Sequence, residues 1–249
     1  MKIILLQRDI VWGDPARNIE RLDEAFRSVA PADLYVLPEM WSSGFATDPV
    51  GYAEETPGAA LEYMIRKSAE LDAAIAGSVA VHDPRGYHNR FYFVKPDGSF
   101  EKYDKHHLFT YSGEHHRYTA GGDRVTVEWR GVRFRLTVCY DLRFPGWCRN
   151  NDGYDVMLCV ASWPEVRVEP WKALLRARAI ENQCYVIAVN RVGDDPGNHY
   201  CGASMAIDAW GNIVAACTDD LECAADIELN MEALKAFREK FPVLGDRDL

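Results

Sequence analysis

Residues 132–145 read VRFRLTVCYDLRFP, and the rest of the chain is best interpreted outward from this stretch. Its first half is rich in apolar and β-branched residues, as in a strand, and Cys139 stands at the end of that run. Pro145 follows and favours the start of a short helix. A thiol at such a turn can meet backbone N–H groups and the positive end of a helix, and both favour the thiolate. The stretch therefore indicates a reactive cysteine, although a buried structural cysteine is the alternative.

Strand-like and helix-like runs alternate on both sides of this turn, in a similar order in each half. The expected strands are 3–7, 33–37, 73–82, 89–95, 99–103, 124–129, 132–138, 154–160, 184–190, 201–208, 213–217 and 223–229. The expected helices are 15–29, one begun by Thr56-Pro57 and continuing to Leu71, a short one after Pro145, 169–182, and one capped by Asn230. This order predicts a single α/β domain over residues 1–249, with two mixed sheets each covered by helices on one side.

Composition narrows the class of protein. The 249 residues are 48% hydrophobic and carry a formal net charge of -10, which disfavours nucleic acid or an anionic membrane as a partner. No apolar run reaches the length of a membrane span or a signal peptide. The cysteine count of 7 is odd and no pair is spaced C-x-x-C. We therefore expect a reduced, cytoplasmic protein rather than a disulfide scaffold.

Two more reactive side chains stand at the ends of predicted strands, where α/β proteins place their sites. Glu39 lies in Leu37-Pro38-Glu39-Met40-Trp41, where desolvation would raise the pKa of a general base. Lys105 lies in Lys105-His106-His107-Leu108-Phe109 and can offer a positive charge to a developing oxyanion. Taken alone, a solvated glutamate and a surface lysine are the commoner interpretations of these two patterns.

Taken together, the three stretches resemble the signatures of the nitrilase superfamily of carbon–nitrogen hydrolases, in the same order along the chain. The resemblance implies a four-layer α-β-β-α sandwich with pseudo-symmetric halves. It implies Cys139 as nucleophile, Glu39 as general base and Lys105 as oxyanion partner, helped by the backbone N–H of Tyr140. It also implies a second glutamate, matched by Glu114, that holds Lys105 charged and oriented. No metal and no cofactor is required, and the family usually forms homodimers.

Tyr140-Asp141 follows the cysteine where true nitrilases usually show Trp-Glu, so the amidase branch is favoured. Trp163-Pro164, Trp171-Lys172 and Ala177–Gln183 resemble the ω-amidase group, which deaminates 2-oxoglutaramate and 2-oxosuccinamate. The predicted function is therefore hydrolysis of the terminal amide of a small ω-amido acid, with water as the second substrate. Another small amide, a carbamoyl compound or a nitrile remains the alternative.

Such a substrate has a carboxylate far from its amide, and this group needs a cationic or N–H-rich pocket. The candidate cations are Arg143, Arg167, Arg176, Arg178 and Arg191. Arg143 is a pocket candidate, although a structural ion pair is the favoured interpretation for it. Phe45, Trp163 and Tyr200 are candidate aromatic walls, although core packing is the commoner fate of such side chains.

Other chemistries fit the sequence less well. His106-His107 and His115-His116 suggest a zinc hydrolase, but adjacent histidines point in different directions and no H-E-x-x-H is present. A serine triad lacks G-x-S-x-G, and a dinucleotide site lacks G-x-G-x-x-G. A thiol redox protein would need Cys148 as resolving cysteine. A binding module without activity would not need all three reactive residues.

Overall fold

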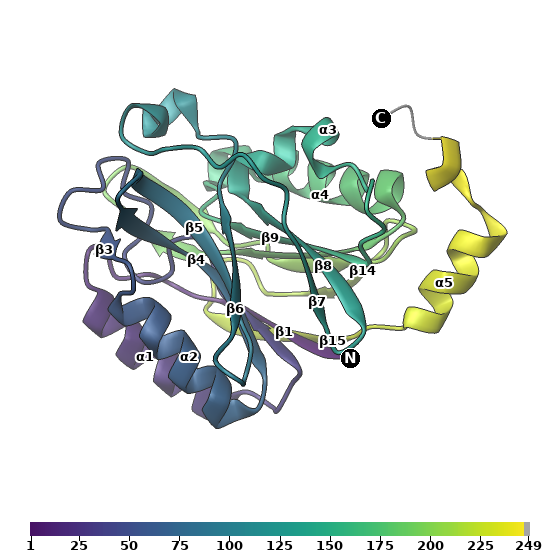
Figure 1. Cartoon of the computed structure of the whole chain (residues 1–249), viewed down its shortest axis with the longest axis horizontal. Coiled ribbons are helices and arrows are strands. Elements are labelled where there is room, and N and C mark those ends of the chain that lie inside the picture. Colours follow the sequence, from purple (N-terminus) through teal and green to yellow (C-terminus); the bar gives the residue numbers. More distant parts are fainter. Residues whose placement is uncertain (247–249) are drawn as a thin grey trace.

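The computed structural model describes residues 1–246 as two large mixed sheets stacked face to face, with helices on their outer faces (Figure 1). Helices α1 (Pro15–Ser28) and α2 (Ala59–Leu71) cover one sheet. Helices α3 (Pro145–Cys148) and α4 (Val168–Asn182) lie against the other. The predicted α-β-β-α sandwich is therefore confirmed. The predicted domain runs to residue 249, and residues 247–249 lie outside the described range.

The first sheet has the order β15-β1-β2-β4-β5-β6, with β3 paired to β4. Strands β1, β2 and β4 are parallel neighbours, and β5, β6 and β15 are antiparallel to the strand beside them. The strands are β1 (Lys2–Gln7), β2 (Leu34–Val36), β3 (Glu54–Glu55), β4 (Ala74–Asp83), β5 (Gly86–Val94), β6 (Phe100–Asp104) and β15 (Cys223–Glu228).

The second sheet repeats this plan with the order β14-β13-β10-β9-β8-β7. Strands β8, β9 and β10 are parallel, and β7, β13 and β14 extend them in antiparallel fashion. Its strands are β7 (Thr126–Trp129), β8 (Val132–Val138), β9 (Val156–Ala161), β10 (Tyr185–Asn190), β13 (Met205–Ile207) and β14 (Ile213–Ala216). A parallel trio flanked by antiparallel strands in each sheet makes the two halves pseudo-symmetric.

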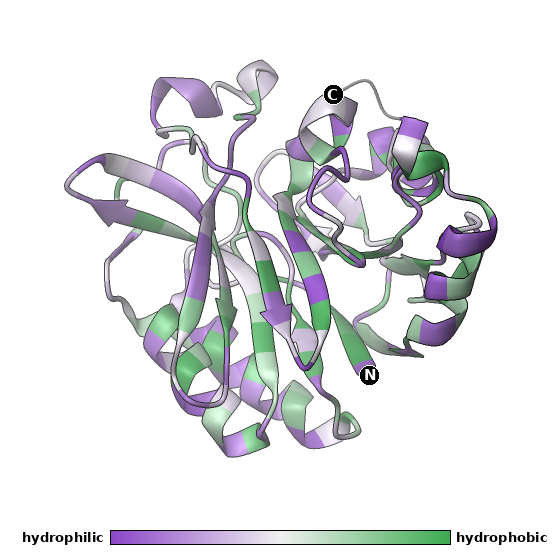
Figure 2. Ribbon diagram, turned by 45° about the vertical axis from the view of Figure 1, so that its right-hand side comes forward, coloured by the Kyte–Doolittle hydropathy of each residue, from purple (hydrophilic) through white to green (hydrophobic). Residues whose placement is uncertain are grey.

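The central core lies between the two sheets, because both present an apolar face to the other. Leu5 and Phe93 from the first sheet join Phe134, Leu136 and Leu158 from the second, and all five are fully buried. Separate apolar layers lie under α1 and α2 and under α4. Figure 2 shows hydrophobic residues gathered along the strands, with hydrophilic residues frequent on the helices and turns.

Several boundaries differ from the sequence expectation. Helix α2 begins at Ala59 with Gly58 as its N-cap, so the predicted cap at Thr56-Pro57 is wrong. The expected strand 201–208 is divided, because its first residue, Cys201, ends β12 (His199–Cys201), which pairs with β11 (Val192–Asp194) instead of joining the main sheet. The predicted cap at Asn230 is confirmed: its side chain accepts from the Ala233 N–H at the start of α5 (Met231–Lys240). Within residues 1–246 the fold also has these 3-10 turns: η1 (Thr110–Ser112), η2 (Glu114–His116), η3 (Cys139–Arg143), η4 (Glu165–Arg167) and η5 (Val243–Asp246).

Among residues 1–246, no helix is both long enough and apolar enough to cross a membrane.

Candidate active site

The reactive side chains lie where strands of the two sheets end. Glu39 follows β2 by three residues, Lys105 directly follows β6, and Cys139 directly follows β8. Ser162 directly follows β9. Strands running the same way bring their carboxyl ends to one edge of a sheet, and stacking of the two sheets places these edges next to each other. Residues that are far apart in sequence therefore meet in one place.

Cys139 has a left-handed backbone with φ +46°, a conformation that is costly for a non-glycine residue and is found at functional sites. The Asp141 side chain holds this turn: Oδ2 accepts from the Val138 N–H at 3.0 Å and from the Tyr103 hydroxyl at 2.7 Å. Its Oδ1 accepts from the His107 N–H at 2.9 Å. Asp141 thus ties the end of β8 to the segment that carries Lys105.

Lys105 lies between two carboxylates, and all three side chains are fully buried. Its Nζ donates to Oε1 of Glu39 at 3.0 Å and to both carboxylate oxygens of Glu114 at 3.1 and 3.0 Å. Oε2 of Glu114 also accepts from the Phe109 N–H at 2.6 Å. A buried ammonium needs such partners, and these contacts fix where its charge lies.

The Glu39 carboxylate is held by three hydrogen-bond donors. Oε1 accepts from Asn89 Nδ2 at 2.7 Å in addition to Lys105, and Oε2 accepts from the backbone N–H of Ser162 at 2.7 Å. The same carboxylate is close enough to Cys139 to raise the pKa of its thiol. The contacts therefore fix a carboxylate near the sulfur, where a base for its proton must be.

The charges of the site set its resting protonation. Burial raises the pKa of the Cys139 thiol, the Glu39 carboxylate raises it further, and Lys105 only partly opposes them. Burial would lower the pKa of Lys105, but Glu114 and Glu39 outweigh it and hold that pKa well above its usual value. Burial also raises the pKa of Glu114. These shifts favour a neutral thiol beside a charged lysine.

The turn at the end of β8 does not by itself decide the state of this thiol. Residues Cys139–Arg143 form only a short 3-10 turn, so its dipole is weak compared with burial and the nearby carboxylate. Ionisation of the sulfur therefore needs an acceptor for its proton, and the Glu39 carboxylate is near it.

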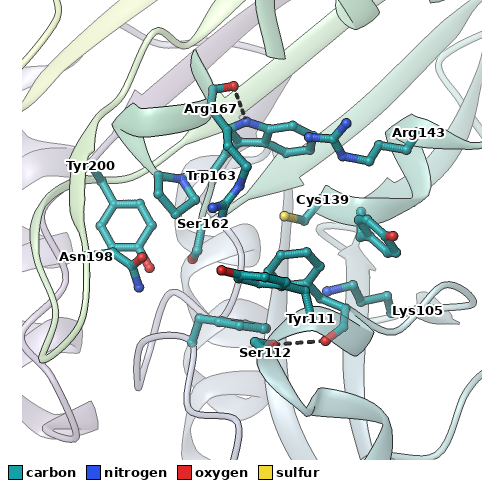
Figure 3. A pocket seen from close by; sticks show the side chains of 14 residues that line it. Lys105, Tyr111, Ser112, Cys139, Arg143, Ser162, Trp163, Arg167, Asn198 and Tyr200 are labelled. Atoms are coloured by element: carbon teal, nitrogen blue, oxygen red, sulfur yellow. Dashed lines mark hydrogen bonds between the residues drawn. The ribbon is translucent and has the colours of Figure 1, made fainter. Parts of the chain in front are cut away.

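A cavity of about 200 Å³ opens onto Cys139 (Figure 3). Lys105, Cys139 and Tyr140 are part of its lining, and the ring centroid of Phe45 lies 5.1 Å from the Lys105 ammonium. The lining residues are Phe45, Lys105, Phe109, Tyr111, Ser112, Cys139, Tyr140, Arg143, Ser162, Trp163, Pro164, Arg167, Asn198 and Tyr200. Phe45, Trp163, Arg143 and Tyr200, all candidates from the sequence, thus lie in one pocket.

The five candidate arginines separate clearly in space. Arg143 and Arg167 line the cavity. The structural ion pair favoured for Arg143 is wrong: within the described residues it has no carboxylate partner, and its guanidinium lies 4.8 Å from the Trp163 ring centroid. Arg178 donates to the Leu142 carbonyl. Arg191 is buried against Asp9 and backbone carbonyls, and Arg176 is exposed outside the cavity.

The adjacent histidines have structural partners. His106 stacks on Trp147 with ring centroids 3.7 Å apart, and its Nδ1–H donates to the Gly121 carbonyl at 2.6 Å. His107 stacks on Phe144 at 3.5 Å. In the part of the chain that the structure describes, no group of three or more His, Cys, Asp or Glu side chains is arranged to hold a metal ion.

Sequence reasoning assigned no role to Asn89, Asp141 and Ser162, although all three order the reactive groups. Asn89 stands between His88 and Arg90 in β5, so no break in an apolar pattern marked it in the sequence. Ser162 follows β9 at its carboxyl end, the same rule that selected Glu39, Lys105 and Cys139.

Comparisons with known proteins agree with this geometry. The sequence model of the carbon-nitrogen hydrolase family matches residues 2–239, so the chain belongs to that family.

Its similarity to particular members extends over nearly all of both chains. It is 47% identical to Omega-amidase YafV of Yersinia enterocolitica, covering 100% of this chain and 97% of the relative. It is 35% identical to 2-oxoglutaramate amidase of Bacillus subtilis, covering 98% and 96%. Among solved structures, the CN-hydrolase superfamily protein XC1258 from Xanthomonas campestris, with an arsenic adduct in its active site, has a TM-score of 0.97 at 41% identity, covering 100% and 97%.

Proposed function

We propose that this protein hydrolyses the terminal amide of a small ω-amido acid, such as 2-oxoglutaramate or 2-oxosuccinamate, through a thioester on Cys139. The observation that carries the proposal is the buried Glu39–Lys105–Glu114 cluster, which holds a base at the thiol of Cys139 where a cavity opens to it. Relatives named as ω-amidase and 2-oxoglutaramate amidase support this choice of amide.

In the first half-reaction, the Glu39 carboxylate takes the thiol proton as sulfur bonds to the amide carbon, and the carbonyl electron pair moves to oxygen. Lys105 and the backbone N–H of Tyr140 stabilise this oxyanion, and losing one such donor costs roughly 10²–10³ in rate. Protonated Glu39 then gives its proton to the amide nitrogen, the C–N bond breaks, and ammonia leaves a thioester behind.

In the second half-reaction, Glu39 takes a proton from water while the water oxygen bonds to the thioester carbon. The second tetrahedral intermediate collapses, the C–S bond breaks, and Glu39 returns its proton to the sulfur. Glu114 takes no proton in this scheme; it holds Lys105 in place. The chain's own residues thus supply each proton transfer.

Ammonia release from 2-oxoglutaramate tests the proposal. Wild-type protein and Cys223→Ala, a cysteine on β15 outside the cavity, should turn over, and Cys139→Ala should not. Measurable turnover by Cys139→Ala would refute the scheme. Retention of activity in EDTA is the expected result, since no step uses a metal.

The second candidate is hydrolysis of another small amide, a carbamoyl compound or a nitrile. The same nucleophile, base and oxyanion donors serve these substrates, so the choice depends on the cavity. A panel of 2-oxosuccinamate, a carbamoyl amino acid and a simple nitrile separates them: the proposal requires the ω-amide to have the highest kcat/KM.

We also propose a cytoplasmic homodimer, in which residues 1–249 form one domain per subunit. Large apolar side chains are exposed on α4, β14 and the nearby turn: Ile180, Trp210, Ile213 and Val214 are 49%, 66%, 48% and 46% exposed. Such a surface favours burial against a second copy. Light scattering should give twice the mass of the 28.2 kDa chain, and a monomer at micromolar concentration would contradict the dimer.

A further inference from the structure

Two cysteines outside the cavity lie at the two ends of one short loop. Cys217 directly follows β14 and Cys223 begins β15, so residues 218–222 join an edge strand of the second sheet to an edge strand of the first. The sulfur of Cys217 lies 4.0 Å from the Cys223 carbonyl oxygen, and the sulfur of Cys223 lies 3.9 Å from the Thr218 carbonyl oxygen. Each sulfur therefore lies against the backbone at the opposite end of the loop.

The side chain of Gln7 fixes both ends of this loop. Gln7 is opposite Cys223 in the ladder between β1 and β15, and its Nε2 lies 3.8 Å from the Cys223 sulfur. The same Nε2 donates to the Thr218 carbonyl at 2.7 Å. Its Oε1 accepts from the Ser204 N–H at 3.0 Å, and the Ser204 carbonyl accepts from the Cys217 N–H at 2.9 Å. One fully buried amide thus holds the two cysteines in a fixed relation.

The two thiols differ in exposure and lie close to each other. Cys217 is buried, whereas Cys223 is partly exposed. Burial raises the pKa of the Cys217 thiol, and the nearby Cys223 thiol raises it further. A partly exposed thiol that solvent can reach, with a second thiol beside it, is the arrangement in which an oxidised cysteine is resolved as a disulfide.

The remaining cysteines are less suited to react with a dissolved oxidant. The thiolate is the reactive form of a cysteine, and burial and Glu39 raise the pKa of the Cys139 thiol. Four other cysteines are buried: Cys148, Cys159, Cys184 and Cys201. Cys223 is therefore the thiol at which oxidation should begin.

We propose that hydrogen peroxide converts Cys217 and Cys223 to a reversible disulfide, and that it does so before it oxidises Cys139. In the first step, the Cys223 thiolate sulfur attacks a peroxide oxygen, the O–O bond breaks, and the departing hydroxide takes up a proton to form water. The sulfur is thereby oxidised by two electrons to a sulfenic acid.

In the second step, the Cys217 sulfur attacks the sulfenic sulfur of Cys223. The S–O bond breaks, the S–S bond forms, and the departing hydroxide takes the proton of the Cys217 thiol to form a second water. This modification site is independent of the proposed amidase reaction, because neither cysteine lines the cavity. The nucleophile stays reduced while the pair is oxidised.

Peptide mass mapping after peroxide treatment tests the proposal. The protein is treated with increasing hydrogen peroxide, denatured in iodoacetamide and cleaved after glutamate. Glu222 lies between the two cysteines, so cleavage there gives separate peptides unless a disulfide joins them. Wild-type protein should give the joined peptides, about 2 Da lighter than the sum of the two reduced peptides, and dithiothreitol should separate them. Cys139 should be alkylated in the same samples.

Three variants sharpen this test. Cys217→Ser should form no disulfide, and its Cys223 should proceed to sulfinic acid, a gain of about 32 Da. Cys223→Ala, a change at a partly exposed position, should also form no disulfide. Cys201→Ser, which removes a buried thiol outside the pair, is the matched control and should form the disulfide as wild type does.

Three results would overturn the pair. One is oxidation of Cys139 at a lower peroxide dose than Cys223 in wild-type protein. The second is a disulfide that joins Cys223 to a cysteine other than Cys217. The third is wild-type protein in which Cys223 reaches sulfinic acid with no joined peptides at any dose. The readout is mass alone, so the result holds whether or not the protein releases ammonia from 2-oxoglutaramate.

Discussion

Replacing Glu114 by Gln tests whether the second carboxylate works through Lys105. Glu114 is fully buried and does not line the cavity, so the change does not touch substrate. A glutamine can keep its carbonyl on the Phe109 N–H and Lys105. Its NH₂ group then faces Lys105 and Asn89, which are both donors. One charge and at least one hydrogen bond are lost.

The magnitude follows from these contacts. Removing one partner of a buried ion pair costs about 3–5 kcal/mol. In the variant, Glu39 still pairs with Lys105 at 3.0 Å, so the loss should be smaller than for a pair with no other partner. We expect the free energy of unfolding to fall by about 2–3 kcal/mol. A displaced oxyanion donor costs roughly 10²–10³ in rate, so kcat should fall by about that factor. KM should change little.

The assay is steady-state ammonia release from 2-oxoglutaramate, with urea denaturation of the same samples. Glu101→Gln is the control, since Glu101 is an exposed glutamate on β6. A Glu114→Gln variant with kcat within about 3-fold of wild type would refute a positioning role. So would a loss that appears only in KM.

Three further outcomes follow from the structure. Because burial and Glu39 raise the pKa of Cys139, its alkylation by iodoacetamide in the free enzyme should still accelerate above pH 9; a plateau below pH 8 would mean a resting thiolate. Gly202→Ala should lower stability by about 2 kcal/mol or more in urea denaturation, since Gly202 has φ +80° and a Cβ would lie 2.2 Å from Gln7 Oε1; an unchanged midpoint would contradict this. Burial would raise the pKa of the Asp83 carboxyl. The hydrogen bond from Arg90 acts in the opposite direction, and the pKa of Asp83 lies below its usual value of 3.8. The stability from that pair is present above about that pH and is lost as pH falls further, so acid destabilisation should be shallower in Asp83→Asn.

The sheets and the strand-end residues could be predicted because local patterns determine them. Apolar runs bounded by turn residues located most strands, and Glu39, Lys105 and Cys139 each directly follow or closely follow such a run. Glu114 lies in a 3-10 turn with no such signal, and only the family resemblance selected it.

The features that could not be predicted from the sequence depend on which distant segments of the chain come together in space. The partnership of Asn89 with Glu39 requires the register of β5 against β4. The choice of Arg143 and Arg167 among five arginines requires knowing which chain segments border the cavity. The protonation of the Cys139 thiol reflects a balance between burial and two opposite charges, and no local pattern contains that balance.

The most direct test of the account is the mass of the enzyme during turnover. Wild-type protein mixed with 2-oxoglutaramate and quenched in acid within milliseconds should carry one acyl group, and peptide mapping should place it on Cys139. Glu39→Gln should not accumulate the adduct. Ammonia release with no acyl adduct under any quench time, or an adduct on another cysteine, would contradict the thioester.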